Sequence, residues 1–257
     1  MLLCPVRDCQ QPLHREDRRW LCPRSHSFDI ARSGYVNLLQ PQDRRSKNPG
    51  DTAEAVAARR RLHHSGVTAP LLHAIGSLLA PASHDTVLDA GCGDGFYLGS
   101  LSLLHGFQAT GIDISIPAID LAARRYPHCH WLVANADRVI PCVGESFSKI
   151  LSITARMNPP EFRRVLRPGG QLLVAIPSPI DLIELRGPSR DRVGRTIQSF
   201  APLFTLQHQQ RATTTAPLDA GAVRDLQHAT YRPLQSQPAE AMQVTFSLDL
   251  LLFATAP

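Results

Sequence analysis

The sequence contains almost no lysine and no long apolar run. Lys47 and Lys149 are the only two lysines, so nearly all of the positive charge is carried by arginine. Nowhere does the chain reach the run of about eighteen apolar residues that a membrane-spanning helix needs. Near the N-terminus, Arg7 and Asp8 interrupt any apolar core that a signal peptide would require. We therefore expect a cytoplasmic protein that does not bind a membrane.

A disulfide framework is not expected either. The chain has six cysteines in 257 residues, and without a secretory signal such cysteines are more typical of metal ligands or buried thiols. Three of them, Cys92, Cys129 and Cys142, lie far from the others in the sequence and need no special role. With 43% hydrophobic and 6% aromatic residues, the chain is suited to one large domain plus a small appendage.

The formal net charge of +5 is concentrated at one end of the chain. Residues 1–61 contain twelve Lys/Arg against seven Asp/Glu, whereas the rest of the chain is balanced. Guanidinium groups suit bidentate contacts with phosphate and stacking on bases, so one interpretation is a polyanionic partner at the N-terminal end. A solvated arginine-rich surface is the other interpretation, and charge alone does not decide between them.

The N-terminal end also holds a candidate metal site. The stretch CPVRDCQQPLHREDRRWLCPRSH has the spacing C-x4-C, then twelve residues, then C-x3-H. Zinc takes four thiolate or imidazole ligands, and two ligand pairs on short turns supply that geometry without a large core. We expect Cys4 and Cys9 on one turn and Cys22 and His26 on the other. The alternative is that Cys9 is a buried thiol and that the histidines are surface residues.

The chain is expected to divide into three parts. Residues 1–36 are rich in turn formers, as expected of a small unit held by metal ligands. Residues 37–64 read as a linker followed by a connecting helix, and Asp51 with Glu54 three residues later resembles a capping box at the start of that helix. Residues 65–257 would form the main domain.

In the main domain, short apolar runs alternate with helical patterns. The runs TVLDA, FQATGIDI, HCHWLVAN, KILSI and QLLVAIP read as strands, and GFYLGSLSLLH, SIPAIDLAARRY and EFRRVLRPGG read as helices. We expect Pro168 and Gly169 to stop the last of these helices, and residues 244–256 to form a further strand. The alternation predicts a doubly wound α/β fold, with a mostly parallel sheet and helices on both faces.

The loop VLDAGCGDGF follows a strand and opens a helix. Gly91 and Gly93 allow the backbone to turn tightly and to approach a ligand closely. A dinucleotide fingerprint would place a pyrophosphate at the helix start, but Asp89 and Asp94 crowd this loop and would repel a phosphate. They suit a ligand that carries an amine and a sulfonium. Asp113, at the end of the next strand, can accept both hydroxyl protons of a ribose.

This loop and the acidic residue after the next strand resemble motifs I and II of class I S-adenosylmethionine-dependent methyltransferases. The residues that carry the resemblance are D-x-G-C-G-D-G and the downstream G-I-D. It implies that the methionine part of the cofactor lies against Gly91, Gly93 and Asp94, with Asp89 beside them. It also implies that Asp113 binds the ribose, and that Asn135 of the segment ANAD stands at the position that contacts adenine.

The segment NPPEF is interpreted as structural. It resembles the NPPY signature of methyltransferases that act on exocyclic amines of bases. However, TARM separates Asn158 from the preceding strand, and Glu161 stands where that signature has its aromatic residue. Asparagine at the N-cap and proline at the first helical position explain the same residues.

The resemblance extends over roughly residues 4–187 to one family, the 23S ribosomal RNA guanine-N1 methyltransferases, in which a zinc ribbon precedes a class I methyltransferase domain. The matching text includes CPRSHSFDIARSGYVNLL, RRSKNPGDTAEAVAARR, VLDAGCGDGFY, GIDIS with AARRYP, and VLRPGG leading to IPSP and DLIELRG. GYVNLL followed by GDTAE is the most diagnostic part, because many methyltransferases share the glycine loop. The resemblance implies zinc and S-adenosylmethionine as cofactors, and a basic N-terminal module that reads a hairpin loop of 23S ribosomal RNA.

Three segments differ from the family pattern, all where the family lines its cofactor and target pocket. Gly-His-Tyr is here Gly66-Val67-Thr68, Tyr-Ala-Pro is Thr154-Ala155-Arg156, and Pro-Gly-Pro-x-His is Pro177-Ser178-Pro179-Ile180-Asp181. By location, Thr68 and Asp181 are candidate cofactor contacts, and Asp181 is also the candidate catalytic base. The alternatives are a methyltransferase for another RNA or a small molecule, and a catalytically silent RNA-binding homologue. The oligomeric state is open, with a homodimer among the options.

Overall fold

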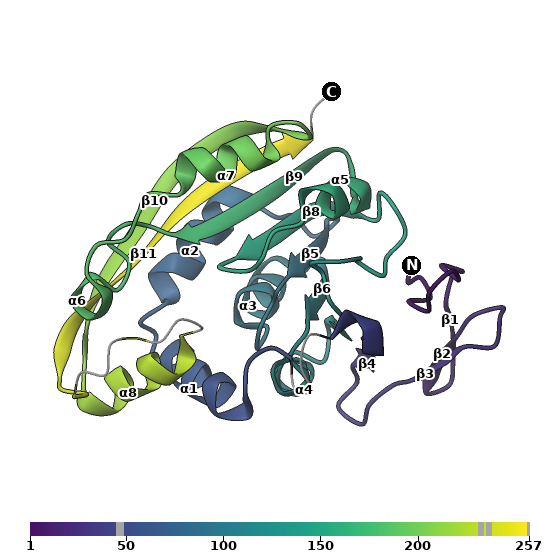
Figure 1. Ribbon diagram of the computed structural model, residues 1–257, viewed down its shortest axis with the longest axis horizontal. Helices are drawn as coiled ribbons and strands as arrows, with labels where there is room; N and C mark the ends of the chain where they lie inside the picture. Colours follow the sequence, from purple (N-terminus) through teal and green to yellow (C-terminus); the bar gives the residue numbers. More distant parts are fainter. Residues whose placement is uncertain (45–48, 231–233, 235–237, 256–257) are drawn as a thin grey trace.

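The computed structural model describes residues 1–44, 49–230, 234 and 238–255, and within them the chain forms a large mixed sheet and a small three-stranded sheet (Figure 1). The eight strands of the large sheet have the order β10-β11-β9-β8-β5-β6-β7-β4. They are β4 (Val36–Asn37), β5 (Thr86–Ala90), β6 (Gln108–Asp113), β7 (His130–Val133), β8 (Phe147–Ile153), β9 (Leu166–Pro177), β10 (Phe204–Leu218) and β11 (Met242–Thr255). Strands β4 to β9 are paired in parallel, and β11 lies antiparallel between β9 and β10. The predicted mostly parallel α/β sheet is therefore confirmed.

Helices cover both faces of this sheet, because successive residues of a strand point to opposite faces. Val87 faces the core that contains residues of α1–α4, α6 and α8, whereas its neighbour Leu88 faces the core that contains residues of α5 and α7. The helices are α1 (Ala53–His64), α2 (Ala69–Leu79), α3 (Phe96–His105), α4 (Ile116–Arg125), α5 (Pro159–Val165), α6 (Ile183–Arg186), α7 (Val193–Phe200) and α8 (Ala220–Ala229), with a 3-10 helix η1 (Pro41–Asp43). Within the described ranges, every helix is too short or too polar to span a bilayer.

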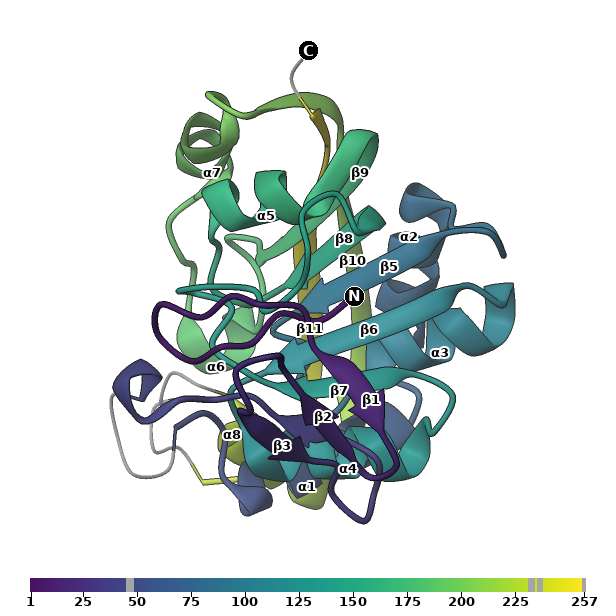
Figure 2. The same cartoon turned by 90° about the vertical axis from the view of Figure 1, so that its right-hand side faces the viewer.

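The small sheet belongs to the N-terminal module and packs on the large one. Its strands β1 (His14–Glu16), β2 (Arg19–Leu21) and β3 (Ser27–Asp29) are antiparallel, and they lie in front of β6 and β7 in Figure 2. Cys4 and Leu13 share a buried cluster with Leu88 and Ile112 of the large sheet. The module is therefore part of the core and not a separate body on a tether.

The module occupies a place that a crossover helix would normally take. Parallel strands are usually joined by a helix that covers one face of the sheet, but the connection from β7 to β8, residues 134–146, contains none. The N-terminus pairs with this connection instead. The Leu3 N–H donates to the Pro141 carbonyl at 2.9 Å, and the Val143 N–H donates to the Met1 carbonyl at 3.0 Å.

The segment that follows residue 36, expected to begin as a linker, begins inside the large sheet. Val36 and Asn37 form β4, which pairs with β7, and Leu38 and Leu39 are buried with 1% and 5% of their surface exposed. Residues 45–48 of the same segment lie outside the described residues. The division into 1–36, 37–64 and 65–257 stays a prediction.

Two helix ends were predicted wrongly. Thr52, not Asp51, caps α1, because its Oγ1 accepts from the Ala55 N–H at 3.2 Å. Helix α5 ends at Val165 and not at Pro168, since the chain already becomes extended at Leu166 and pairs there with β8. The helical conformation is disfavoured for the residue before a proline, and strand pairing adds to that preference.

Candidate metal centre and cofactor site

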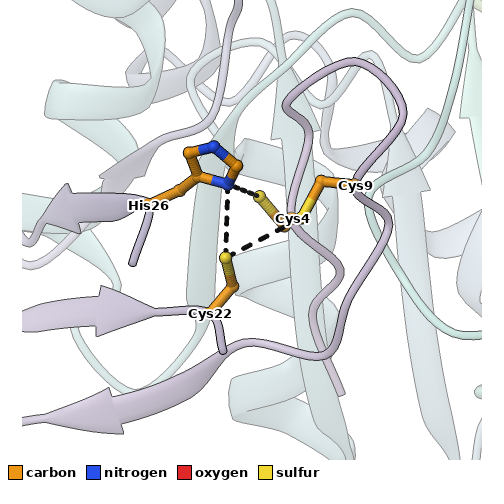
Figure 3. Close-up of side chains that lie close together, drawn as sticks. All are labelled: Cys4, Cys9, Cys22 and His26. Atoms are coloured by element: carbon orange, nitrogen blue, oxygen red, sulfur yellow. Dashed lines mark hydrogen bonds between the residues drawn. The ribbon is translucent and has the colours of Figure 1, made fainter. Parts of the chain in front are cut away.

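The four predicted metal ligands meet at one point. The ligand atoms of Cys4, Cys9, Cys22 and His26 all lie within 4.8 Å of one another (Figure 3). His26 Nδ1 lies 3.4 Å from Cys4 Sγ and 3.3 Å from Cys22 Sγ, and the sulfurs of Cys9 and Cys22 lie 3.8 Å apart. A tetrahedral zinc ion, with bonds of about 2.3 Å to sulfur and about 2.0 Å to nitrogen, requires ligand separations of about 3.5–3.8 Å. The donor set therefore fits zinc.

Short turns hold each ligand pair. The Cys9 N–H donates to the Val6 carbonyl at 3.0 Å, and the Ser25 N–H donates to the Cys22 carbonyl at 2.9 Å. Local hydrogen bonds therefore define both turns, and the three cysteines also belong to a buried cluster shared with the large sheet. Two ligand pairs on two turns are the arrangement that the paired spacing of the sequence predicts.

Burial makes the thiols costly to ionise unless a cation is present. It raises the pKa of Cys4 to about 12. At Cys22 burial acts in the same direction, but hydrogen bonds with the backbone of His26 and Arg24 outweigh it and lower the pKa to about 7. One ligand thus ionises near neutral pH, and a bound zinc ion would hold the others as thiolates.

The glycine loop lies at the carboxyl end of β5, where the strand order reverses. β5 has β6 on one side and β8 on the other, so the carboxyl ends of these strands form a topological switch point, the place where open α/β sheets have their ligand crevice. Gly91 and Gly93 have φ angles of 89° and 55°, which residues with a side chain rarely adopt. A side chain at Gly91 would also collide with Ala155 of the loop after β8.

Asp89 is a buried residue, and one oxygen of its carboxylate has no hydrogen-bond partner among the described residues. The residue is 2% exposed, and the oxygen is Oδ1. Burial, and then the nearby carboxylate of Asp113, raise the pKa of Asp89 to about 8. Burying such a group is costly unless a donor or a cation reaches it. The site therefore fits a ligand that brings an ammonium group.

Asp113 connects the end of β6 to the glycine loop. Its Oδ2 accepts from the Gly93 N–H at 2.9 Å, and its Oδ1 accepts from the Ser115 N–H at 2.8 Å. Burial raises the pKa of its carboxyl group in spite of these two bonds. The structure thus brings Asp113 to the loop as expected, and its role toward a ribose stays a prediction.

Two residues of the connecting helix α1 also face the loop, and sequence analysis missed them. Arg59 donates from Nη1 to Asp51 Oδ2 at 2.6 Å and from Nη2 to the Ala229 carbonyl at 2.8 Å. One turn later, the His63 ring stacks on Phe96 with centroids 4.0 Å apart. Arg59 and His63 are four residues apart, so the sequence predicts that they share one face of the helix. It does not predict that this face packs against the glycine loop.

His63 links Thr68 to the glycine loop. Its Nδ1 lies 2.8 Å from Thr68 Oγ1, and its Nε2 lies 3.9 Å from Asp94 Oδ1. Burial, and then the charge of Arg59, lower the pKa of His63 to about 3, so the ring is neutral at physiological pH and does not form an ion pair with Asp94. Burial raises the pKa of Asp94. Thr68 is thus close to the predicted cofactor site, and its contact with the cofactor stays a prediction.

Asp181 lies in the turn after β9. Its Oδ1 accepts from the Ser247 N–H of β11 at 2.9 Å, and burial raises its pKa. Sequence analysis did not single out Tyr97. Burial, and then the carboxylates of Asp94 and Asp181, raise the pKa of its phenol. Both carboxylates therefore act on this phenol. The role of Asp181 as a base stays a prediction.

Asn135 lies just beyond β7, and its side chain is already engaged. Its Nδ2 donates to the Asp43 carbonyl at 2.9 Å, and its Oδ1 accepts from the Asp137 N–H at 3.1 Å. One amide hydrogen is left for an external acceptor, because Nδ2 carries two. The contact of Asn135 with adenine stays a prediction.

The capping interpretation of NPPEF is confirmed. Asn158 is the N-cap of α5, and its Oδ1 accepts from the Glu161 N–H at 3.4 Å. Glu161 in turn accepts from the Ile140 N–H at 2.7 Å. These residues hold the connection between β7 and β8 in place, which is a structural role.

A separate groove of about 610 Å³ lies on the outer side of α1, between α1 and α4. Val56, Arg60, Leu121 and Arg124 are among its lining residues, and none of the glycine-loop residues is. Arg60 and Arg59 are consecutive, so one helix presents one arginine to this groove and the other to the loop. The groove is therefore not part of the candidate cofactor site.

Comparison with known proteins finds family matches for two segments of the chain. Residues 2–47 match a zinc-ribbon family model described as "RlmA, N-terminal", and residues 87–170 match one described as "Methyltransferase domain". The chain is 37% identical to the 23S rRNA (guanine(748)-N(1))-methyltransferase of Streptomyces fradiae, over 86% of this chain and 81% of that protein. It is 38% identical to a putative 23S rRNA (guanine-N(1)-)-methyltransferase of Micromonospora griseorubida, over 72% of this chain and 68% of that protein.

Solved structures agree on the fold. The chain is similar to a chain of the complex between the Haloferax volcanii Trm112 methyltransferase activator and a putative methyltransferase, with a TM-score of 0.53 and 20% identity. The similarity covers 81% of this chain and 99% of that one. At this level of identity the likeness shows the methyltransferase fold alone.

The metal centre leads to the first prediction. We expect about one zinc ion per chain, because three thiolates and one imidazole form a closed structural site. Cys22→Ser should reduce the zinc content to near zero and lower the melting temperature, since Cys22 shares a buried cluster with the large sheet. Elemental analysis and calorimetric melting measure the two effects. Cys129→Ser changes a buried cysteine of the other cluster and should keep the zinc. Full zinc content in the Cys22 variant would exclude this site.

The cofactor site leads to the second prediction. Asp113→Ala should weaken binding of S-adenosylmethionine by roughly 1–3 kcal/mol, the scale of a lost charge-assisted hydrogen bond. Because Asp113 also accepts from Gly93 and Ser115, Asp113→Asn is a second variant that keeps one acceptor oxygen. Titration calorimetry gives the affinities, and a melting curve shows whether the loop is intact. Unchanged affinity in a folded variant would mean that the ribose is held elsewhere.

Proposed function

The chain belongs to the family of 23S ribosomal RNA guanine-N1 methyltransferases, and from this premise we propose that it methylates N1 of a guanine in 23S ribosomal RNA. One observation carries the proposal: a zinc-ligand cluster and a glycine loop suited to a sulfonium cofactor are joined in one chain, in the order and spacing of that family. Its cofactors are zinc and S-adenosylmethionine.

When bound, S-adenosylmethionine supplies a methyl carbon that its sulfonium sulfur already activates. The task of the chain is to align guanine N1 with that carbon and to exclude water. The loops after β5 and β8 touch at one point, where a side chain at Gly91 would collide with Ala155. The crevice at the carboxyl ends of these strands is where the target base would enter.

Guanine N1 carries a proton that must leave as the carbon–nitrogen bond forms and the carbon–sulfur bond breaks. We assign this proton to Asp181, which lies in the turn after β9. Burial raises the pKa of Asp181, and a raised pKa makes a carboxylate a better proton acceptor. The contact with the Ser247 N–H would hold this carboxylate in place while it accepts the proton.

The target guanine must be unpaired or flipped, because N1 lies on the Watson–Crick edge. Proteins that read RNA sequence mostly bind loops, where bases are free to leave the stack. A hairpin loop of 23S ribosomal RNA is therefore the substrate that we propose.

We propose that the basic N-terminal module contacts the RNA. Arg18 and Arg19 are exposed at the turn between β1 and β2, and Arg44 is exposed directly after η1. Arg45 belongs to the same proposal and lies outside the described residues. Arg19 and Glu16 form only an exposed ion pair of 3.1 Å, which leaves this arginine available to a phosphate.

The remaining expectations follow from the substrate. Residues 1–36 would be the zinc-binding RNA-recognition module, residues 37–64 the linker and connecting helix, and residues 65–257 the methyltransferase domain. The protein would work in the cytoplasm, where ribosomal RNA is found. A homodimer would use β10, the edge strand of the large sheet, as the strand that a second copy extends.

RNA binding leads to the third prediction. Each phosphate contact contributes about 0.7–0.9 to the slope of log affinity against log salt concentration. Changing the four proposed contact residues to glutamine should therefore flatten that slope by up to roughly 3. The residues to change together are Arg18, Arg19, Arg44 and Arg45. The matched control changes four other exposed arginines, which are Arg167, Arg190, Arg195 and Arg224. Equal slopes for the two variants would assign the N-terminal charge to a solvated surface.

The product leads to the fourth prediction. A methyl group on guanine N1 removes a Watson–Crick donor, so reverse transcriptase should stop one nucleotide before the modified base. We expect a strong stop in a hairpin loop of 23S RNA that depends on the enzyme and on S-adenosylmethionine. Mass spectrometry of the fragment should show 1-methylguanosine. A methylated adenosine, or methylation of a small molecule with the RNA untouched, would overturn the proposed substrate. RNA binding without methyl transfer would indicate a catalytically silent homologue.

A further inference from the structure

The charges around the glycine loop do not match those of the cofactor. Asp89, Asp94 and Asp113 gather there, and burial raises the pKa of all three carboxyl groups. S-adenosylmethionine brings two cationic groups, an ammonium and a sulfonium, which suit these carboxylates. It also brings one carboxylate, and three acidic side chains offer that group nothing but repulsion. A cation supplied by the chain at this place would offset that repulsion.

Arg59 is the cation that α1 brings to the loop. A Cβ atom placed on Gly93 would lie 3.4 Å from Arg59 Nη1, so the guanidinium lies next to the loop backbone. Its charge acts to lower the pKa of both Asp94 and Asp113. Arg125 also acts on Asp94, but its Nη1 and Nε contact His64 and Tyr126.

The guanidinium of Arg59 is held in place and still has donors to spare. Nη1 donates to Asp51 Oδ2 at 2.6 Å, and Nη2 donates to the Ala229 carbonyl at 2.8 Å. A guanidinium carries five N–H donors, and these two bonds leave three for a ligand. The side chain is 25% exposed, so a ligand in the crevice can reach it.

We propose that Arg59 binds the carboxylate of the methionine part of S-adenosylmethionine. This inference rests on the proposed function, because it takes that cofactor as the ligand of the glycine loop. The ammonium group then faces the unpartnered oxygen of Asp89, and the carboxylate faces α1. A competing role for Arg59 is purely structural, since its bond to Ala229 ties α1 to the end of α8.

The test compares two ligands that differ only in this carboxylate. Titration calorimetry measures binding of S-adenosylmethionine and of decarboxylated S-adenosylmethionine to the full chain and to Arg59→Gln. The unchanged chain should prefer the carboxylated ligand by about ten- to a hundred-fold, the range of a charge-assisted contact. The Arg59 variant should lose most of that preference and should bind the decarboxylated ligand about as well as the parent does.

Arg60→Gln is the matched control. It removes the same charge from the adjacent position of the same helix, where the side chain lines the outer groove. It should keep the full preference for the carboxylated ligand. Arg59→Lys retains a cation with fewer donors and should show an intermediate preference, provided that the charge itself is recognised.

Several results would overturn the assignment. If Arg59→Gln weakened both ligands equally, Arg59 would be a structural tether of α1. If Arg60→Gln lost the preference as well, long-range charge and not contact would be responsible. Equal affinity of the unchanged chain for the two ligands would exclude a carboxylate contact even if no Arg59 variant folded. Failure of the unchanged chain to bind either ligand would instead contradict the proposed function, and the inference with it.

Discussion

The change of winding direction at β5 is the constraint on which the candidate site depends. From β5 the chain proceeds through β6 and β7 to one side of the sheet, and then through β8, β9 and β11 to the other. The carboxyl ends of the strands at such a switch point are the usual ligand site of an open α/β sheet. The glycine loop and the turn with Asp181 come directly after a strand and Asp113 ends one, so all three belong to the carboxyl edge of the parallel strands. The position of the candidate site therefore follows from the strand order alone.

A parallel sheet must also be covered on both faces, and this second constraint explains the position of the N-terminal module. The connection between β7 and β8 carries no helix in residues 134–146, and the module covers the exposed half of the sheet instead. A unit of this size cannot form a large apolar core, and four metal ligands take over that role. Metal binding therefore contributes to the stability of the catalytic domain, whatever the module contributes to RNA recognition.

Helix α1 lies beside the glycine loop. This position gives a structural role to the diagnostic segment RRSKNPGDTAEAVAARR, which contains the first part of α1. Its aspartate, Asp51, accepts from Arg59, and Arg59 and His63 of the same helix lie over the glycine loop. The neutral His63 ring fills the space between Phe96 and Thr68 without adding charge. The buried carboxylates below it are costly for the free protein and become favourable when a cationic ligand binds. These buried carboxylates thus lower the stability of the free protein at the place where ligand binding needs their negative charge.

The sequence by itself determined the features that depend on residues close together in the chain. These are the alternating strands and helices, the metal ligands on their two turns, the glycine loop with Asp113, and the capping role of Asn158. Local spacing encodes each of them, because the chemistry needs only a turn or the end of a strand. The tertiary structure alone decided that Thr52 and not Asp51 caps α1, and that Val36 and Asn37 join the large sheet. It also decided that Arg59 faces the loop, since that orientation depends on contacts such as the one with Ala229, 170 residues away. Such distant contacts leave no trace in local periodicity, and the sequence of one chain does not reveal them.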